Sequence, residues 1–165
     1  MNATQRRQLA ALCPTVSWEA HMAAYSTFRS GGLVEALVEI HREEELPPLL
    51  HWLSQQDIPW QVIGGGSNIL VATRRQEGVF LRLRGSVRDM LLAPSTDGDG
   101  CALVRVPAGC SLAALVGWCS KQGLAGMSFM AGIPGTVGGA VRMNAGAFGH
   151  AIGERLHGLR CVDAR

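Results

Sequence analysis

The stretch Trp60-Gln-Val-Ile-Gly-Gly-Gly-Ser-Asn68 places three consecutive glycines directly after a short apolar run. A strand is expected over 60–63, and consecutive N–H groups of the glycine loop can turn inward and cradle an anion. Ser67 and Asn68 can add side-chain donors. The loop is not a dinucleotide-binding G-x-G-x-x-G motif, because Ile69 stands at the third glycine position, and no Lys-Ser/Thr pair ends it as in an ATPase phosphate loop. A tight turn that needs small residues is an equal alternative.

Outward from this loop, strand-like and helix-like patterns alternate. Residues 33–40 (LVEALVEI) predict a strand. Residues 43–56 (EEELPPLLHWLSQQ) predict a helix, because apolar residues recur at helical spacing and acids crowd its first turn. Two further strands are expected over 68–72 and 78–83. Residues 33–85 therefore predict a β-α-β unit with added strands.

The second half of the chain predicts one helix and several short strands. The helix is expected over 111–122, with Ser111 as its N-cap and Gly123 as its C-terminal stop. Strands are expected over 87–93, 101–107 and 159–162. The turn-rich sequence STDGDG at 95–100 is expected to join the first two as a hairpin.

A second glycine-rich segment reads GIPGTVGG at 132–139 and NAGAFG at 144–149. Ordinary loops gain solubility from polar residues, whereas the only charge nearby is Arg142. This composition favours a backbone that approaches a large or flat ligand with its N–H groups. Thr136 and Asn144 are the neutral side chains with hydrogen-bonding capacity. Close packing of a strand on a helix also selects glycine and is the alternative.

Two such segments together predict a ligand with phosphates and an extended apolar body. Neither segment contains a lysine. A charge-assisted N–H to phosphate bond contributes roughly 1.5–3 kcal/mol, so four or five of them would hold a diphosphate. We therefore expect the main-chain amides of both segments to be aimed at one shared diphosphate.

Composition excludes several classes of protein. Of the 165 residues, 47% are apolar and 17% charged, which indicates a folded chain rather than a disordered one. The 21 glycines show no Gly-X-Y period, so the chain is not collagen-like. The apolar runs fall short of the roughly 20 residues of a membrane span. The run before Pro14 is too short for a signal peptide.

The charge and the spacing of cysteines and histidines bear on nucleic-acid binding, disulfides and metal sites. The formal net charge is +2, and no basic stripe is interleaved with aromatic rings, which argues against a nucleic-acid platform. The five cysteines lack a Cys-x-x-Cys pair, and the five histidines lack paired spacing. We expect reduced, mostly packed thiols in a cytoplasmic protein without a metal site.

Three motifs, taken in order, closely resemble those of the UDP-N-acetylenolpyruvoylglucosamine reductase family. They are STFRSGG at 26–32, GGGSN at 64–68, and GIPGTVGG with NAGA at 132–147. The resemblance implies an α+β, two-subdomain FAD-binding fold of the vanillyl-alcohol oxidase (PCMH) type. The residues that it implies for FAD binding are Gly64, Gly65, Gly66, Ser67, Asn68, Ile69, Gly132, Ile133, Pro134, Gly135, Thr136, Gly138, Gly139, Asn144, Ala145 and Gly146.

The resemblance also implies a reaction. In this family NADPH reduces FAD, and the flavin reduces the enolpyruvyl group of UDP-N-acetylenolpyruvoylglucosamine to give UDP-N-acetylmuramate for peptidoglycan, and so for cell shape and division. A serine supplies the other proton, with a glutamate and an arginine assisting. Partners of the full-length enzyme would be FAD, NADPH and this sugar nucleotide, in the cytoplasm, with neither nucleic acid nor membrane.

The family pattern predicts an N-terminal extension over 1–20 and FAD-binding subdomains over 21–85 and 86–165. The family's catalytic residues lie beyond residue 165, in part in a C-terminal substrate-binding domain that is expected to be absent. No catalytic residue is therefore assigned, and the chain alone is expected to be inactive. Arg142 does not match the family's catalytic arginine, and Phe148 stands where the family commonly has tyrosine.

Two alternatives remain. Other flavin oxidases share the GGGSN loop and often bond a histidine or cysteine covalently to the flavin, for which Cys110 is a candidate. A non-catalytic nucleotide-binding or interaction module would instead use an apolar surface for docking.

Overall fold

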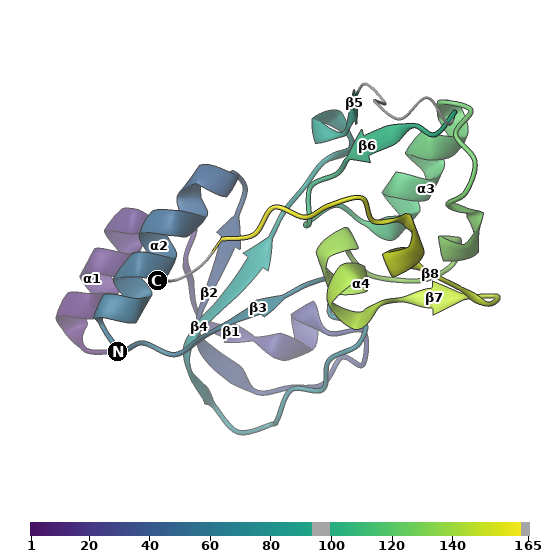
Figure 1. Ribbon diagram of the computed structural model, residues 1–165. Helices are drawn as coiled ribbons and strands as arrows, with labels where there is room; N and C mark the ends of the chain where they lie inside the picture. Colours follow the sequence, from purple (N-terminus) through teal and green to yellow (C-terminus); the bar gives the residue numbers. More distant parts are fainter. Residues whose placement is uncertain (94–99, 163–165) are drawn as a thin grey trace. The chain divides into compact units, whose positions relative to one another are not determined.

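The computed structural model describes residues 1–93 and 100–162, which belong to two units. Met1–Leu83, together with Cys161 and Val162, build the N-terminal unit, and Arg84–Arg160 build the C-terminal unit (Figure 1). The predicted hairpin link at 95–100 lies, apart from Gly100, outside the described residues. Among the described residues, no helix combines the length and apolar character needed to cross a bilayer.

A four-stranded mixed sheet forms the N-terminal unit. Its strands are β1 (Ser17–His21), β2 (Leu33–Ile40), β3 (Trp60–Ile63) and β4 (Gln76–Leu83). Their spatial order is β1-β2-β4-β3, with β1 antiparallel to β2, and with β2 and β3 both parallel to β4. The predicted β-α-β unit is confirmed as β2, α2 (Leu46–Gln55) and β3, and β4 enters between its two strands.

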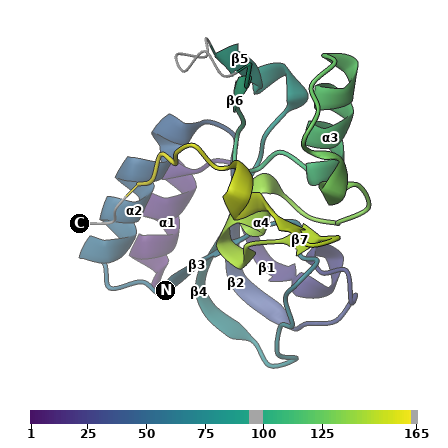
Figure 2. The same cartoon turned by 45° about the vertical axis from the view of Figure 1, so that its right-hand side comes forward.

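The two helices of this unit, α1 (Ala3–Leu12) and α2, lie side by side on one face of the sheet (Figure 2). They bury an aliphatic core against alternate residues of the two central strands. The core residues are Leu9, Leu49, Leu50 and Leu53 from the helices and Ala36, Val38, Ile40, Val79 and Leu81 from the strands. The helix predicted over 43–56 starts at Leu46, because Glu43–Glu45 form a 3-10 turn ahead of the two prolines.

An irregular segment, 64–75, packs on the opposite face of the sheet. Ile69 and Val71 contact the buried residues of that face, whereas Leu70 between them is 82% exposed. The strand expected over 68–72 does not form, so that prediction was wrong. Side-chain alternation fixes which residues face a core, but a strand also needs a neighbour for its backbone groups.

The first 21 residues form two elements that the sequence did not predict. α1 is capped by Asn2, whose side chain accepts from the Gln5 N–H while the Gln5 side chain accepts from the Asn2 N–H. The helix buries only Leu9 fully, so its apolar period is weak. β1 is five residues long and carries Glu19 at a φ of 51°. These residues give the sheet its antiparallel edge and part of its helical cover.

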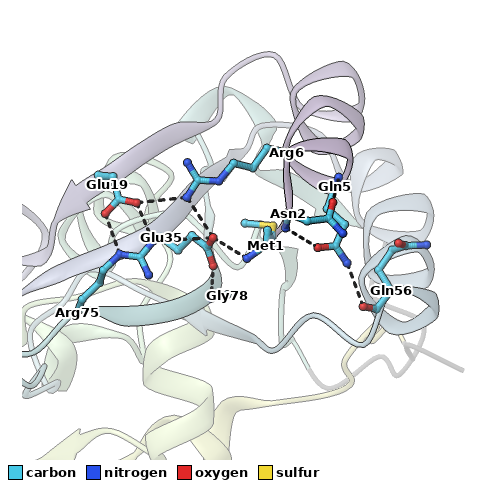
Figure 3. Close-up of polar contacts among 9 residues, drawn as sticks. All are labelled: Met1, Asn2, Gln5, Arg6, Glu19, Glu35, Gln56, Arg75 and Gly78. Carbon is cyan, nitrogen blue, oxygen red and sulfur yellow. Dashed lines mark hydrogen bonds and ion pairs between the residues drawn. The ribbon is translucent and has the colours of Figure 1, made fainter.

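A buried carboxylate ties these first residues to the sheet (Figure 3). Glu35 on β2 is 2% exposed, and its oxygens accept from the Met1 amino group at 2.7 Å, from Arg6 at 3.1 Å and from the Gly78 N–H at 3.1 Å. Burial alone raises the pKa of Glu35, but these donors outweigh it and hold the pKa below its ordinary value. Glu19 extends the network by binding Arg75 at 2.7 Å.

The C-terminal unit is assembled from short elements. They are the hairpin β5 (Leu91–Ala93) with β6 (Leu103–Arg105), the helices α3 (Leu112–Lys121) and α4 (Val137–Met143), and the hairpin β7 (Gly146–Ala147) with β8 (His150–Ala151). α3 confirms the predicted helix, with the Ser111 side chain accepting from the Ala114 N–H and with Gly123 at a φ of 70°. Phe129, Met130 and Ala140 fill the core against α3.

Other predictions for this half need correction. The strand expected over 87–93 is a 3-10 turn at Val87–Asp89 followed by β5, and the strand expected over 101–107 shortens to β6. No strand forms at 159–162, where Leu159 is 62% exposed and has no core to join. α4 was missed altogether, because its sequence VGGAVRM contains two glycines, which disfavour helix.

Candidate functional site

The first glycine loop begins where β3 ends and is packed against another stretch of backbone. Gly66 has a φ of 74°, and a Cβ there would collide with the Tyr25 carbonyl and lie 3.1 Å from the Cα of Ser26. The Gly66 carbonyl accepts from the Thr27 N–H at 2.9 Å. The loop is thus held against the turn 26–29, which belongs to the first motif of the sequence.

This part of the fold keeps unused hydrogen-bonding capacity. Within the described residues, the N–H groups of Gly65 and Gly66 donate to no acceptor. Ser26 beside them is only 7% exposed, and its buried hydroxyl has no hydrogen-bond partner in the described chain. Buried polar groups are almost always paired, so the unpaired Ser26 hydroxyl and the amide of the buried Gly66 mark a place where a further acceptor fits, with the amide of the exposed Gly65 next to them. A phosphate oxygen is such an acceptor.

In the second glycine-rich segment, several amides already donate hydrogen bonds to acceptors within the chain. The Val137 N–H donates to the Cys110 carbonyl at 2.8 Å, and the Gly138 N–H donates to the Ala108 carbonyl at 2.7 Å. The Gly139 N–H donates to the Thr136 hydroxyl, which caps α4. A Cβ on Gly138 would lie 2.9 Å from that of Ala108. The close-packing explanation of these glycines therefore holds in this segment.

Free donors remain just before α4. Among the hydrogen bonds of the described chain, none uses the N–H groups of Gly132, Gly135 or Thr136. Gly132 and Gly135 have φ angles of 85° and 125°, which L side chains rarely adopt. The amides of Gly132, Gly135 and Thr136 can therefore donate to a ligand without breaking an internal bond, whereas the Ile133 N–H already donates to the Met130 carbonyl at 3.1 Å.

The NAGA residues stabilise the end of α4. Asn144 is its left-handed C-cap at a φ of 46°, and its side chain accepts from the Gly153 N–H at 3.1 Å. The Ala145 N–H donates back to Ala140 at 2.8 Å. A Cβ on Gly146 would lie 2.9 Å from the Cα of Ala151 across the hairpin. The local fold therefore accounts for Asn144 and Gly146, and their contact with a cofactor stays a prediction.

The predicted site residues thus form two groups. Residues 64–69 come together in the N-terminal unit, and residues 132–139 with 144–146 come together in the C-terminal unit. That both groups serve one diphosphate stays a prediction. Sequence reasoning missed Ser26 and Thr27 as part of the first group, although they begin the motif STFRSGG.

The side chains considered for chemistry near the second segment are not activated. Cys110 is 1% exposed, and burial raises the pKa of its thiol, which disfavours the nucleophilic thiolate. This weighs against a covalent flavin bond through Cys110. Arg142 is exposed on the last turn of α4. Among the described residues, no group of three or more histidine, cysteine or acidic side chains is arranged to hold a metal ion.

Comparison with known proteins identifies the family of this chain. The family described as "FAD binding domain" matches residues 34–165. The chain belongs to this family. Amides that are free at glycine loops fit the diphosphate of its cofactor, FAD. The fold class expected from the sequence, an α+β FAD-binding fold, is confirmed.

The resemblance to UDP-N-acetylenolpyruvoylglucosamine reductases is also confirmed. The enzyme of that name from Syntrophus aciditrophicus is 41% identical over 139 residues, which are 84% of this chain and 44% of the relative. The one from Bacillus velezensis is 40% identical over 135 residues, 82% of this chain and 42% of the relative. The chain therefore spans less than half the length of these relatives.

A solved structure gives the same result. The crystal structure of UDP-N-acetylenolpyruvylglucosamine reductase from Thermus caldophilus is similar with a TM-score of 0.60 and 29% identity. The match covers 81% of this chain and 44% of that one.

Proposed function

We propose that this chain is the FAD-binding part of a UDP-N-acetylenolpyruvoylglucosamine reductase. In the longer protein, NADPH would serve as the reductant and UDP-N-acetylenolpyruvoylglucosamine as the substrate that is reduced to UDP-N-acetylmuramate. The observation that carries the FAD half is the pair of unpartnered amides at Gly65 and Gly66, beside a buried, unpaired hydroxyl. The reductase half is supported by the relatives, each of which is 41% identical or less and about twice as long.

The chain's own residues divide the work of holding FAD. Gly65 and Gly66, with the side chains of Ser67 and Asn68, would bind phosphate oxygens. The free N–H groups of Gly132, Gly135 and Thr136 would add donors, with Ile133 and Pro134 as the apolar surface beside them. Gly64, Ile69, Gly138, Gly139, Asn144, Ala145 and Gly146 would hold these donors in place. Bound FAD would supply the redox chemistry, and no residue of this chain is assigned a catalytic role.

The proposal places the protein in the synthesis of peptidoglycan precursors, with consequences for cell shape and division. Its substrate and its reductant are both soluble nucleotides, and the cytoplasm is the compartment that holds them.

Titration of the purified chain with FAD tests the proposal, with flavin fluorescence as the readout. We expect saturable binding by a folded chain, and we expect no NADPH-dependent reduction of the enolpyruvyl sugar nucleotide by this chain alone. Riboflavin is the matched control, because it carries the flavin ring without phosphates and should bind much more weakly.

The two halves of the proposal fail separately. A folded chain that leaves flavin fluorescence unchanged at high micromolar FAD would contradict FAD binding. Measurable turnover by the 165-residue chain would contradict its expected inactivity and would require catalytic groups within this chain.

A further inference from the structure

The turn 26–29 is fastened directly to the first glycine loop. The Arg29 N–H donates to the Ser26 carbonyl at 3.0 Å and closes the turn, and the Thr27 N–H donates to the Gly66 carbonyl at 2.9 Å. The missing side chain at Gly66 lets the two backbones meet, since a Cβ there would lie 3.1 Å from the Cα of Ser26. Whatever the amides of Gly65 and Gly66 bind therefore lies close to this turn.

Arg29 holds an unfavourable backbone conformation in this turn. Its φ is 50°, in the left-handed region, where a non-glycine residue costs about 1–2 kcal/mol. Glycine would adopt the same angles without that cost. Backbone geometry alone thus favours glycine here, and strain of this kind is a reason to look for a functional role of the side chain.

Arg29 is also an uncommitted charge. Several arginines of the N-terminal unit are paired with acids, as Arg6 and Arg75 are with Glu19, and Arg82 is with Glu39, whereas Arg7 and Arg74 pair with no acid among the described residues. Arg29 is exposed and forms no ion pair or side-chain hydrogen bond with any described residue. Residues 64–68, by contrast, offer N–H donors but no positive side chain.

We propose that Arg29 binds the diphosphate of FAD together with the amides of the first glycine loop. A guanidinium presents a planar fork of N–H donors that matches two phosphate oxygens at once. It supplies the positive charge that the loop itself lacks, and the strained turn holds it beside the loop. The inference rests on the proposed function and names a residue that the motif of glycines does not include.

Replacing Arg29 by glycine separates the two effects of this residue. In Arg29→Gly the strain disappears, so thermal unfolding of the chain without ligand should occur at an unchanged or higher temperature. FAD affinity should nevertheless fall by about 10- to 100-fold, because a charge-assisted bond is lost. Arg29→Lys should lose less affinity, since the charge remains. ADP, which carries a diphosphate without a flavin, should show the same ranking of variants.

Two control variants match the two changes. Asp57 has the same φ of 50° in the loop before β3, so Asp57→Gly relieves similar strain away from the glycine loop. Arg7 is exposed on α1, on the opposite face of the sheet, so Arg7→Gln removes a charge there. Neither control should change the FAD affinity more than twofold. The affinity of the unaltered chain should also fall more steeply with added NaCl than that of Arg29→Gly.

The outcomes distinguish this inference from the proposed function. An unaltered chain that binds FAD, with Arg29→Gly binding equally well and with equal salt dependence, would overturn the role of Arg29 alone. A folded chain that binds neither FAD nor ADP would overturn both.

Discussion

Glu35 shows how one residue can anchor a whole end of the chain. Its carboxylate is nearly inaccessible, and it receives an amino group and a guanidinium from the N-terminal segment and a backbone N–H from Gly78. A buried charge is costly unless donors surround it, and losing one partner leaves the others uncompensated. The sequence placed Glu35 in a strand but had no means of revealing these partners, which lie 29 to 43 positions away.

Replacing the carboxylate should therefore destabilise the N-terminal unit. We expect Glu35→Gln to lower the free energy of unfolding by about 3 kcal/mol at pH 7, at the low end for a broken buried pair because Arg6 remains partly in water. Urea unfolding measures the change. Glu44→Gln, an exposed acid in the 3-10 turn before α2, is the control and should change stability by less than about 0.5 kcal/mol.

The contribution of Glu35 to stability should also depend on pH, and the lowered pKa fixes the direction. The pKa of Glu35 in the folded chain is below its ordinary value, so the unfolded chain binds this proton more tightly. Its stabilising effect is complete above the ordinary glutamate pKa of about 4.3 and is lost as the pH falls through the lowered pKa. The stability difference between the unaltered chain and Glu35→Gln should shrink from pH 7 to pH 3. A difference that stayed constant would contradict this.

At the level of elements, the sequence predicts a helix or strand best where the pattern of its own residues indicates that element. α3 has apolar spacing, a start signal and a stop signal, and it was found where expected. α2 was recognised from its apolar spacing, but it begins at Leu46 rather than at Glu43. Residues 68–72 have the apolar composition of a strand but no partner strand. α4 has two glycines, but a threonine caps it and it packs against Ala108. Their structure is decided by contacts that no local pattern contains.

The same limit applies to the glycines of the candidate site. The glycines of both segments were predicted to allow a close approach of the backbone, to a ligand or to a neighbouring element. At Gly66 and Gly138 a Cβ would indeed collide with neighbouring atoms. The sequence could not decide between ligand approach and close packing, because each selects the absence of a side chain. The structure divides them: amides are free at Gly65 and Gly66, whereas those of Gly138 and Gly139 are committed internally.

α4 therefore depends on Gly138 even without a ligand. We expect Gly138→Ala to destabilise the chain by about 1–3 kcal/mol, because its Cβ would press on the Cβ and carbonyl of Ala108 at 2.9 and 3.1 Å. Gly117→Ala is the matched control, because Gly117 lies within α3 and a Cβ there meets open space. It should stabilise the chain by up to about 1 kcal/mol.

Thermal unfolding of the chain without FAD measures both changes. If Gly138→Ala were as stable as the unaltered chain and lost only FAD affinity, ligand approach rather than packing would explain this glycine.

At the scale of the whole molecule, the two groups of site residues belong to different units, so FAD that is bound by both should couple their stabilities. A ligand that requires both units to be folded raises the free energy of opening of each by RT ln(1 + [L]/Kd), about 2.7 kcal/mol at a hundredfold excess over Kd. Hydrogen exchange of β4 and α3, one element from each unit, should then slow by the same factor when FAD is added.

Glu35→Gln turns this expectation into a test of coupling. Without FAD, the variant should speed exchange in β4 and leave α3 unchanged. With FAD present, it should speed exchange in α3 as well, because unfolding of the N-terminal unit releases a ligand that the C-terminal unit shares, and binding energies couple reciprocally. If neither FAD nor Glu35→Gln changed the exchange rate of α3, the N-terminal loop would hold the cofactor alone. The amides of Gly132, Gly135 and Thr136 would then serve a different ligand or none.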